Sequence, residues 1–272
     1  VDLFGSLGAT IAGGGPAFIQ MYLEQQRARP DRPILPELRF MTSGGAPVPP
    51  EKHEAVKREI GGVGVTPGYG RTECPMISMP HPDDPDEKLA TTEGRPVPGC
   101  HVRIVTEDGT EAAVGQVGEV RVAGAMVCAG YVDSSLDADA FDDQGSLRTG
   151  DLGFLDADGF VTLTGRLKDI IIRKGENISA GEIEDVLYAH PKVGEVAVVG
   201  LPDVSRGELV CAVVTATDPT DPLTFDEMVQ WCRDAEIMTQ KIPERLELVD
   251  ALPRNATGKV LKHELTTTYD AA

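Results

Sequence analysis

Two carboxylates in this sequence end short glycine-containing segments, where they could contact a polar ligand. Glu73 ends the segment GYGRTE, residues 68–73, which follows a predicted strand at residues 63–66. A hard divalent cation prefers oxygen ligands and keeps several waters, so Glu73 could hold one. Asp151 ends the segment RTGD, residues 148–151, and its two acceptor oxygens suit a pair of hydroxyl donors. These two residues indicate a site for a polar ligand that carries a metal ion.

Two basic side chains occur beside glycines further along the chain. Lys259 lies between Gly258 and Val260, and Arg166 follows Gly165. A compact ammonium on a flexible stem suits a group that enters a site for one step and then leaves it. Each residue also has an ordinary interpretation, as a solvated lysine or as a member of a weak surface ion pair. The order of motifs along the chain decides between these interpretations.

The elements that would position these residues predict two kinds of domain, spanning residues 1–167 and 168–272. Residues 1 to about 95 are typical of the later part of an α/β domain, whose strands deliver loops to the ligand-binding edge of the sheet. Residues 92–167 contain short strands and glycine turns, which predict a small barrel-like β subdomain. The remaining residues predict a small α+β domain of ordinary size. The fold class is therefore α/β followed by α+β.

The junction between these domains is the segment GRLKDIIIRKGENISAGEIE, residues 165–184. A short apolar run at residues 170–172 predicts a strand, and Lys174-Gly175 predicts a turn. Ser179 with Glu182 predicts a capping box at the start of a helix, and Thr224 with Glu227 predicts a second one. Charge and glycine on both sides of so short a strand are typical of a segment that approaches a polar ligand and moves.

The composition excludes several classes of protein. The chain has 272 residues with 44 Asp plus Glu and 25 Lys plus Arg, a net charge of −19, so its field repels nucleic acid and anionic membranes. No run approaches the roughly 18 apolar residues of a membrane helix. The five cysteines contain no C-x-x-C pair, which argues against a cysteine zinc site and a disulfide framework and favours the reduced cytoplasm.

Five ordered motifs resemble those of the adenylate-forming enzymes, which include acyl-CoA synthetases, coumarate–CoA ligases, luciferases and the adenylation domains of peptide synthetases. Besides the junction segment they are SGGAPV (43–48), GYGRTE (68–73), RTGD (148–151) and PRNATGK (253–259). Any one of them is a weak signal, whereas five in the family's order are specific. The resemblance covers nearly all of this chain but only about the second half of the family's length.

The resemblance implies a role for each candidate residue in the first part of the chain. Glu73 would hold Mg²⁺, Thr72 would donate its hydroxyl to phosphate, and Tyr69 would stack on adenine. Asp151 would accept from the ribose hydroxyls. The nucleotide would also meet backbone at small residues, which allow a close approach. These are Gly44, Gly45, Ala46, Gly68 and Gly70.

The resemblance implies further roles in the last part of the chain, which rotates in this family after adenylation. Arg166 would lie beside Asp151, Lys168 would be the hinge, and Lys259 would neutralise charge that develops during adenylation. Lys174 and Gly175 would contact coenzyme A. The sequence departs from the coumarate ligases at Ile172, where those enzymes carry a lysine.

We therefore expect an acid–CoA ligase that uses ATP, Mg²⁺ and coenzyme A on a small carboxylic acid, as a possible homodimer. The family's Ser/Thr/Gly-rich phosphate loop and upstream acyl-site motif have no counterpart here, and the chain begins with Val1. We therefore expect a C-terminal half, inactive alone. Two alternatives stay open. One is an amino-acid or aryl-acid adenylation domain that loads a carrier protein, and the other is a truncated, non-catalytic nucleotide-binding module.

Overall fold

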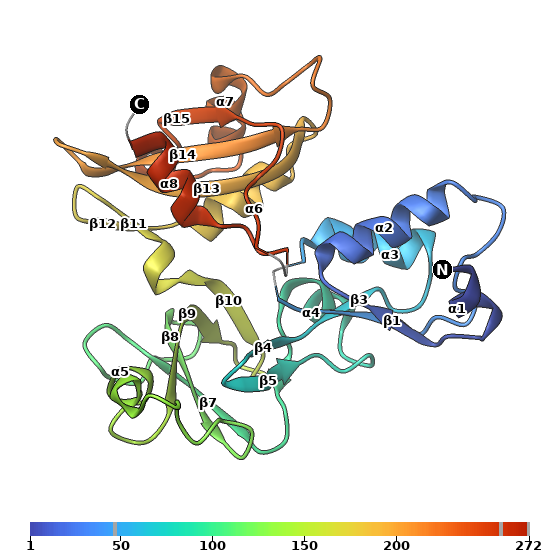
Figure 1. The fold of residues 1–272 in the computed structure, drawn as a ribbon, viewed down its shortest axis with the longest axis horizontal. Helices are drawn as coiled ribbons and strands as arrows, with labels where there is room; N and C mark the ends of the chain where they lie inside the picture. Colours follow the sequence, from blue (N-terminus) through green and yellow to red (C-terminus); the bar gives the residue numbers. More distant parts are fainter. Residues whose placement is uncertain (46–47, 256–257, 271–272) are drawn as a thin grey trace. The chain divides into compact units, whose positions relative to one another are not determined.

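A computed structural model describes residues 1–45, 48–255 and 258–270 (Figure 1). The chain divides into two compact units, Val1–Leu163 and Thr164–Ala272. This division lies within strand β10 (Val161–Arg166), four residues before the boundary expected from the sequence. The described residues form a mixed α/β fold built from several sheets.

The first unit begins with a three-stranded parallel sheet in the order β1-β2-β3. Its strands are Ile11–Gly13, Phe40–Ser43 and Val65–Pro67. Helices α2 (Pro16–Arg27) and α3 (Pro50–Glu59) connect these strands, and a short helix α1 (Asp2–Ser6) precedes them. Apolar residues of α2 and α3 pack with the central strand in one buried cluster, as parallel sheets require. The chain thus leaves each strand at the same edge.

The rest of the first unit is antiparallel. A small sheet has the order β4-β5-β6, and a larger one has the order β10-β9-β8-β7. One hydrophobic cluster joins Cys74 and Ile77 of the small sheet to Val120, Val122 and Leu147 of the larger one. The strands are β4 (Tyr69–Arg71), β5 (Cys74–Met79), β6 (Arg95–Pro96), β7 (Cys100–Val105), β8 (Gly118–Gly124) and β9 (Leu147–Leu155), with helices α4 (Asp86–Thr91) and α5 (Asp137–Ala140). The β subdomain expected from the glycine turns lies in this region.

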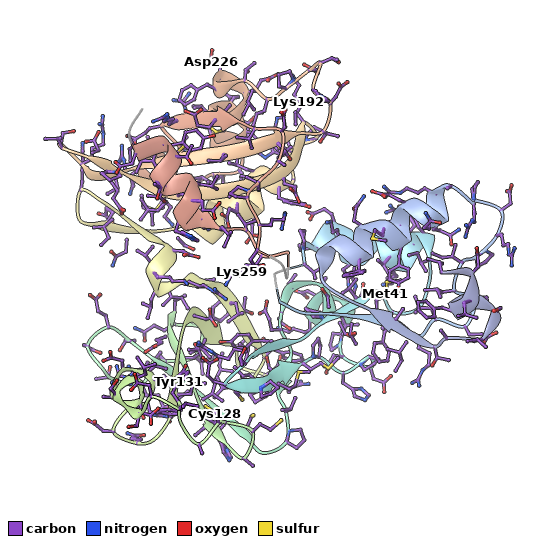
Figure 2. The ribbon with its side chains drawn as sticks, viewed as in Figure 1. Met41, Cys128, Tyr131, Lys192, Asp226 and Lys259 are labelled. Atoms are coloured by element: carbon purple, nitrogen blue, oxygen red, sulfur yellow. The ribbon has the colours of Figure 1, made fainter. Side chains whose placement is uncertain are left out.

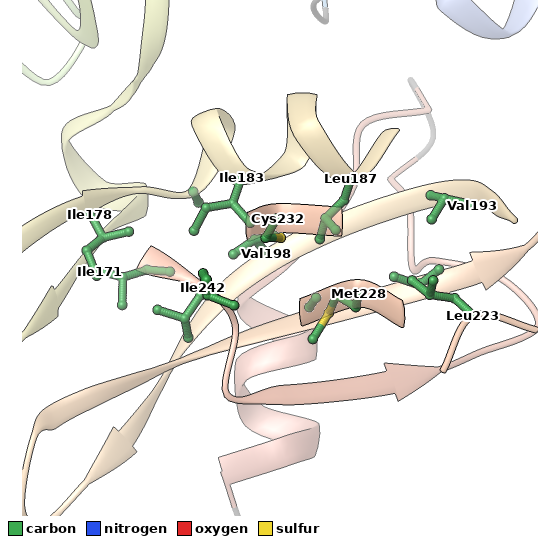
Figure 3. Packing of buried hydrophobic residues seen from close by; sticks show 14 residues of the cluster. Ile171, Ile178, Ile183, Leu187, Val193, Val198, Leu223, Met228, Cys232 and Ile242 are labelled. Carbon is green, nitrogen blue, oxygen red and sulfur yellow. The ribbon is translucent and has the colours of Figure 1, made fainter. Parts of the chain in front are cut away.

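The second unit is a five-stranded sheet covered by helices on both faces. Its order is β12-β11-β14-β13, and β15 pairs in parallel with β14. Figure 3 shows Ile183 and Leu187 packing with Met228, Cys232 and Val198 in the core on one face. Leu265 packs with alternate residues of β13 and β14 on the other face. The elements are β11 (Ile170–Arg173), β12 (Glu176–Ser179), α6 (Ala180–Tyr188), β13 (Val193–Asp203), β14 (Gly207–Ala216), α7 (Phe225–Asp234), β15 (Arg245–Leu248) and α8 (Lys262–Asp270).

One of the two capping boxes predicted from the sequence forms, and the other does not. Thr224 accepts from the Glu227 backbone N–H, and the Glu227 carboxylate accepts from the Thr224 backbone N–H. Ser179 precedes α6 but makes no side-chain cap, so that prediction was wrong. Its hydroxyl instead donates to the Thr164 carbonyl at 2.6 Å. Its expected partner Glu182 lies 2.7 Å from Lys241 Nζ.

The described helices are either too short or too polar to cross a bilayer.

Candidate active site

The carboxyl ends of all three parallel strands surround one pocket in the first unit. The pocket has a volume of about 460 Å³. It is lined by residues at or directly after the ends of β1, β2 and β3 and by residues of β4 and β5, namely Gly14, Gly15, Thr42, Ser43, Gly44, Gly45, Gly68, Tyr69, Gly70, Pro75, Met76 and Met79. Open α/β sheets bind ligands at this edge because loops diverge from it. The glycine segments chosen from the sequence therefore line a single hollow.

The glycines of this pocket differ in why they are required. Gly45 has φ of +85°, in the left-handed region that disfavours other residues. A Cβ on Gly70 would overlap the Pro75 carbonyl oxygen on the neighbouring strand. Gly68 donates its N–H to the Ser43 carbonyl at 2.6 Å, which joins the ends of β2 and β3. Ala46, the next predicted contact, lies outside the described residues.

Tyr69 and Asp151 meet although 82 positions separate them. The Tyr69 hydroxyl donates to Asp151 Oδ2 at 2.8 Å, and the two residues are 6% and 7% exposed. Burial, together with the neighbouring Asp151 charge, raises the pKa of Tyr69 far above its ordinary value, so the phenol stays protonated. The antiparallel strand β9 supplies Asp151, and β4 supplies Tyr69. The structure thus connects the GYGRTE and RTGD motifs directly.

Glu73 lies with Thr72 in the turn between β4 and β5, and two donors hold its carboxylate. Arg71 Nε donates to Oε2 at 2.9 Å, and the Tyr131 hydroxyl donates to Oε1 at 2.5 Å. The hydrogen bond from Arg71, with that from Tyr131, lowers the pKa of Glu73 to about 2 despite partial burial. Glu73 is therefore ionised at neutral pH. Thr72 is exposed beside it.

Arg71 and Tyr131 belong to this site, although sequence reasoning did not select them. Arg71 also donates to the Thr149 carbonyl, which lies two residues before Asp151. Figure 2 shows Tyr131 close to Cys128 on the loop after β8, and Cys128 N–H donates to the Glu73 carbonyl at 2.7 Å. Arg71 stands inside the GYGRTE motif and could have been chosen for its charge. Nothing local in the sequence marks Tyr131, because 58 residues separate it from Glu73.

The donor set around Glu73 fits a magnesium ion that is shared with a phosphate ligand. Mg²⁺ is usually bound by one or two carboxylates together with substrate phosphates and waters. Glu73 supplies one ionised carboxylate, which keeps lone pairs beyond those used by Arg71 and Tyr131. This set is sufficient for such a shared ion, and it is too small to hold Mg²⁺ without a ligand.

The second unit carries the remaining candidates, and the hinge region comes first. Arg166 ends β10 and is half-buried, and Lys168 is exposed in a short 3₁₀ helix, Leu167–Asp169. Lys174 and Gly175 form the two-residue turn between β11 and β12, with φ of 52° and 84°. These angles match a type I′ hairpin turn, which requires positive φ at both central residues. The turn predicted at Lys174-Gly175 is confirmed.

Lys259 lies on an exposed loop before α8, and Figure 2 labels it there. Its backbone N–H donates to Asn255 Oδ1, and its carbonyl accepts from the Asn255 backbone N–H, both at 2.9 Å. These two hydrogen bonds connect the loop at Asn255 and Lys259, and the Lys259 side chain extends from it. Two residues of this motif, Ala256 and Thr257, lie outside the described residues.

Two family models match this chain. Residues 1–132 match the AMP-binding enzyme family, and residues 182–259 match the AMP-binding enzyme C-terminal domain. The chain belongs to this superfamily of adenylate-forming enzymes.

Named relatives of this chain are CoA ligases. A methyl-dioxo-octahydroindenyl propanoyl:CoA ligase of Rhodococcus jostii is 38% identical over 259 residues, which cover 94% of this chain and 47% of that protein. A 2-succinylbenzoate–CoA ligase of Bacillus licheniformis is 36% identical, with 91% of this chain and 50% of that protein covered. The chain spans about half the length of these relatives.

The fold is also found in solved structures. ATP-bound MatB from Rhodopseudomonas palustris superposes with a TM-score of 0.89 at 32% identity, covering 99% of this chain and 53% of that one. The amide bond synthetase McbA from Marinactinospora thermotolerans gives 0.86 at 34% identity, covering 98% of this chain and 54% of that one. The same fold is thus found in ATP-bound MatB and in an amide bond synthetase.

Proposed function

We propose that this chain is the C-terminal half of an AMP-forming acid–CoA ligase. The intact enzyme converts a carboxylate and ATP to acyl-AMP and pyrophosphate. It then converts acyl-AMP and coenzyme A to acyl-CoA and AMP. The observation that carries the proposal is the pocket at the carboxyl edge of the parallel sheet. There Tyr69 donates to Asp151, and Arg71 and Tyr131 hold Glu73 in the adjoining turn.

The first half-reaction brings together two anions, so it depends on positioning and charge neutralisation. Glu73 would hold Mg²⁺, which supplies positive charge beside the phosphates, and Thr72 would donate to a phosphate oxygen. Asp151 would bind the ribose hydroxyls with Arg166 beside it, and Tyr69 would lie against adenine. The small residues Gly44, Gly45, Ala46, Gly68 and Gly70 would let backbone approach the nucleotide.

The second unit would separate the two half-reactions. Lys259 would neutralise developing charge during adenylation only, and Lys168 would be the pivot between the two states. Lys174 and Gly175 would contact coenzyme A during thioester formation. Lys168, Lys174 and Lys259 are exposed, which supports roles in only one of the two steps. Each could contact a ligand and release it without first leaving a buried position. Five free cysteines are compatible with the proposed cytoplasmic location.

The relatives differ in the molecule that accepts the acyl group. The names of the matched relatives favour coenzyme A as this acceptor. The test expresses the parent reading frame and measures AMP release with a panel of acids, with coenzyme A or with a phosphopantetheinyl carrier protein as acceptor. Acid-dependent AMP release that requires coenzyme A supports the proposal. Transfer to the carrier alone would support the amino-acid or aryl-acid alternative.

The 272-residue chain alone should adenylate poorly, because each lost charge-stabilising group typically costs about 10²–10³-fold in rate. Acid-dependent pyrophosphate exchange by this chain is compared with exchange by the parent enzyme. Exchange near the parental rate would show that the absent phosphate loop is unnecessary. A parent frame that encodes no phosphate loop upstream of Val1 would favour the non-catalytic module instead.

A further inference from the structure

A buried histidine on the first unit is outside the pocket described above. His53 lies on α3 with its side chain 1% exposed. Its Nδ1 is 2.9 Å from the Val65 carbonyl oxygen and 3.2 Å from the Val65 amide nitrogen. Gly64 makes room for the ring, because a Cβ there would lie 2.7 Å from His53 Cε1. The imidazole is thus held firmly against β3 through one of its two nitrogens.

The other nitrogen, Nε2, is buried and makes no hydrogen bond to the described residues. It faces Asp86, the first residue of α4, whose Oδ1 lies 3.5 Å away. Nδ1–H donates to the Val65 carbonyl in one tautomer, and in the other tautomer Nδ1 accepts from the Val65 N–H. A metal ion on Nε2 requires the first tautomer. In that tautomer a bare nitrogen lone pair faces a carboxylate oxygen. Two electron-pair donors in that arrangement repel each other unless a cation lies between them.

We propose that His53, Glu54 and Asp86 form a binding site for a divalent transition-metal ion, and that zinc is the ion that fits. One ligand atom of each residue lies within 4.8 Å of the others. Zinc binds nitrogen and carboxylate oxygen at about 2.0–2.2 Å with tetrahedral geometry, so its ligand atoms lie roughly 3.3 Å apart. The 3.5 Å from Nε2 to Oδ1 is close to that spacing. Water would be the fourth ligand.

The surroundings of His53 match those of a metal-binding histidine. Such residues usually donate their second ring N–H to a backbone carbonyl or a carboxylate, which orients the ring. The Val65 carbonyl has this position relative to His53. One imidazole and two carboxylates suit zinc better than magnesium, which prefers oxygen ligands alone. A bound ion would connect α3 to α4 and, through Val65, to β3.

The ammonium of Lys57 would compete with the metal ion for the Asp86 carboxylate. Its Nζ lies 2.5 Å from Asp86 Oδ1, one helical turn after His53 on α3. The side chain is 39% exposed, so the ammonium can move into solvent when a divalent ion binds. We therefore expect removal of this charge to tighten zinc binding. An increase in zinc affinity on removal of Lys57 would distinguish a metal site from a structural ion-pair cluster. In such a cluster, removal of Lys57 would only weaken the interactions of Asp86.

The test titrates the metal-free 272-residue chain with Zn²⁺ by calorimetry and with Co²⁺ by visible absorption. One saturable Zn²⁺ per chain is expected, with the intense visible bands of tetrahedral Co²⁺. Glu54→Gln changes an exposed ligand and should weaken zinc binding at least about 10-fold. Lys57→Met should tighten it. Glu51→Gln, on the same helix outside the cluster, should leave zinc affinity unchanged.

Asp86→Asn provides a second ligand variant, and circular dichroism checks that each variant folds. Absence of saturable binding at millimolar Zn²⁺ would overturn the proposal. Equal affinities for Glu54→Gln and Glu51→Gln would also overturn it, because the binding would then reflect only the acidic surface. Neither readout depends on ligase activity, so failure here leaves the proposed function untouched.

Discussion

The candidate residues of the two units are held in opposite ways. In the first unit, Tyr69, Asp151 and Glu73 are buried or partly buried, and side chains from distant strands hold them by hydrogen bonds. In the second unit, Lys259 and Lys174 are exposed, and their backbone N–H groups donate to Asn255 Oδ1 and to the Arg206 carbonyl respectively. The first set is positioned before any ligand arrives.

In the proposed two-step enzyme, this difference would meet two demands. Groups that stabilise charge are most effective when they are fixed in advance, because no reorganisation is then needed during the reaction. Groups that act in only one step must also leave. The comparison therefore predicts that changes in the first unit perturb stability as well as activity, whereas changes in the second unit separate the two half-reactions.

Lys259→Ala in the parent enzyme should have the largest effect. Acyl-AMP formation should fall about 10²–10³-fold, because a charge-neutralising group is lost. Conversion of supplied acyl-AMP to acyl-CoA should stay within about threefold of the parental rate. Rapid-quench assays measure each half-reaction separately. Lys174→Ala is the matched control, and it should slow only the thioester step. Equal losses in both steps for Lys259→Ala would indicate a structural lysine.

Lys168→Pro should have the next largest effect. Proline fixes φ near −65° and removes a backbone donor, so the hinge should be trapped in one state. If that state is the adenylating one, thioester formation should fall at least about tenfold more than adenylation. Lys168→Ala, which keeps the backbone free, should preserve both steps. Parental rates for the proline variant, with an unchanged melting transition, would show that the chain does not turn at Lys168.

Tyr131→Phe tests the positioning of groups in the first unit. The variant removes one hydrogen bond to the ionised Glu73, and such bonds contribute about 1.5–3 kcal/mol. The free energy of unfolding of the 272-residue chain, measured with urea, should fall by about 1–2 kcal/mol because Tyr131 is only partly buried. Tyr22→Phe removes a hydroxyl that makes no hydrogen bond to the described residues and should cost less. Equal costs would mean that the hydroxyl of Tyr131 does not hold Glu73.

Glu184→Gln should have the smallest effect, and its sign depends on pH. Burial raises the pKa of Glu184, although Lys262 Nζ lies 2.8 Å from its carboxylate. The folded state therefore binds the proton more tightly than the unfolded state, so this residue's contribution to stability is lost as pH rises through the raised pKa. Glutamine carries no such charge and can still accept from the Val198 N–H.

The stability of Glu184→Gln relative to the parent should therefore increase as pH rises from about 4, the ordinary range of a glutamate, through the raised pKa. Urea unfolding at several pH values measures this trend. Lys262→Met should become relatively less stable over the same range, because it removes the cation beside the partly buried carboxylate. A difference between Glu184→Gln and the parent that is constant with pH would contradict the assignment.

Local sequence patterns were sufficient for much of the fold. The Lys174-Gly175 turn separates β11 from β12, and Thr224 caps α7, both as predicted. These features depend on the backbone preferences of a few neighbouring residues, so a local reading can find them. The same reasoning failed at Ser179, because its hydroxyl donates to the carbonyl of Thr164, fifteen residues away, instead of capping the helix.

By itself the sequence determined the family, the order of the motifs and the chemical type of each candidate side chain. The tertiary structure alone decided which of these side chains meet. Tyr131 reached Glu73, Tyr69 reached Asp151, and His53 faced Asp86 only because packing of strands and helices brought distant segments together. Hydrogen bonds act over about 3 Å, whereas the residues that make them are separated by tens of positions. No pattern of neighbouring residues encodes that proximity.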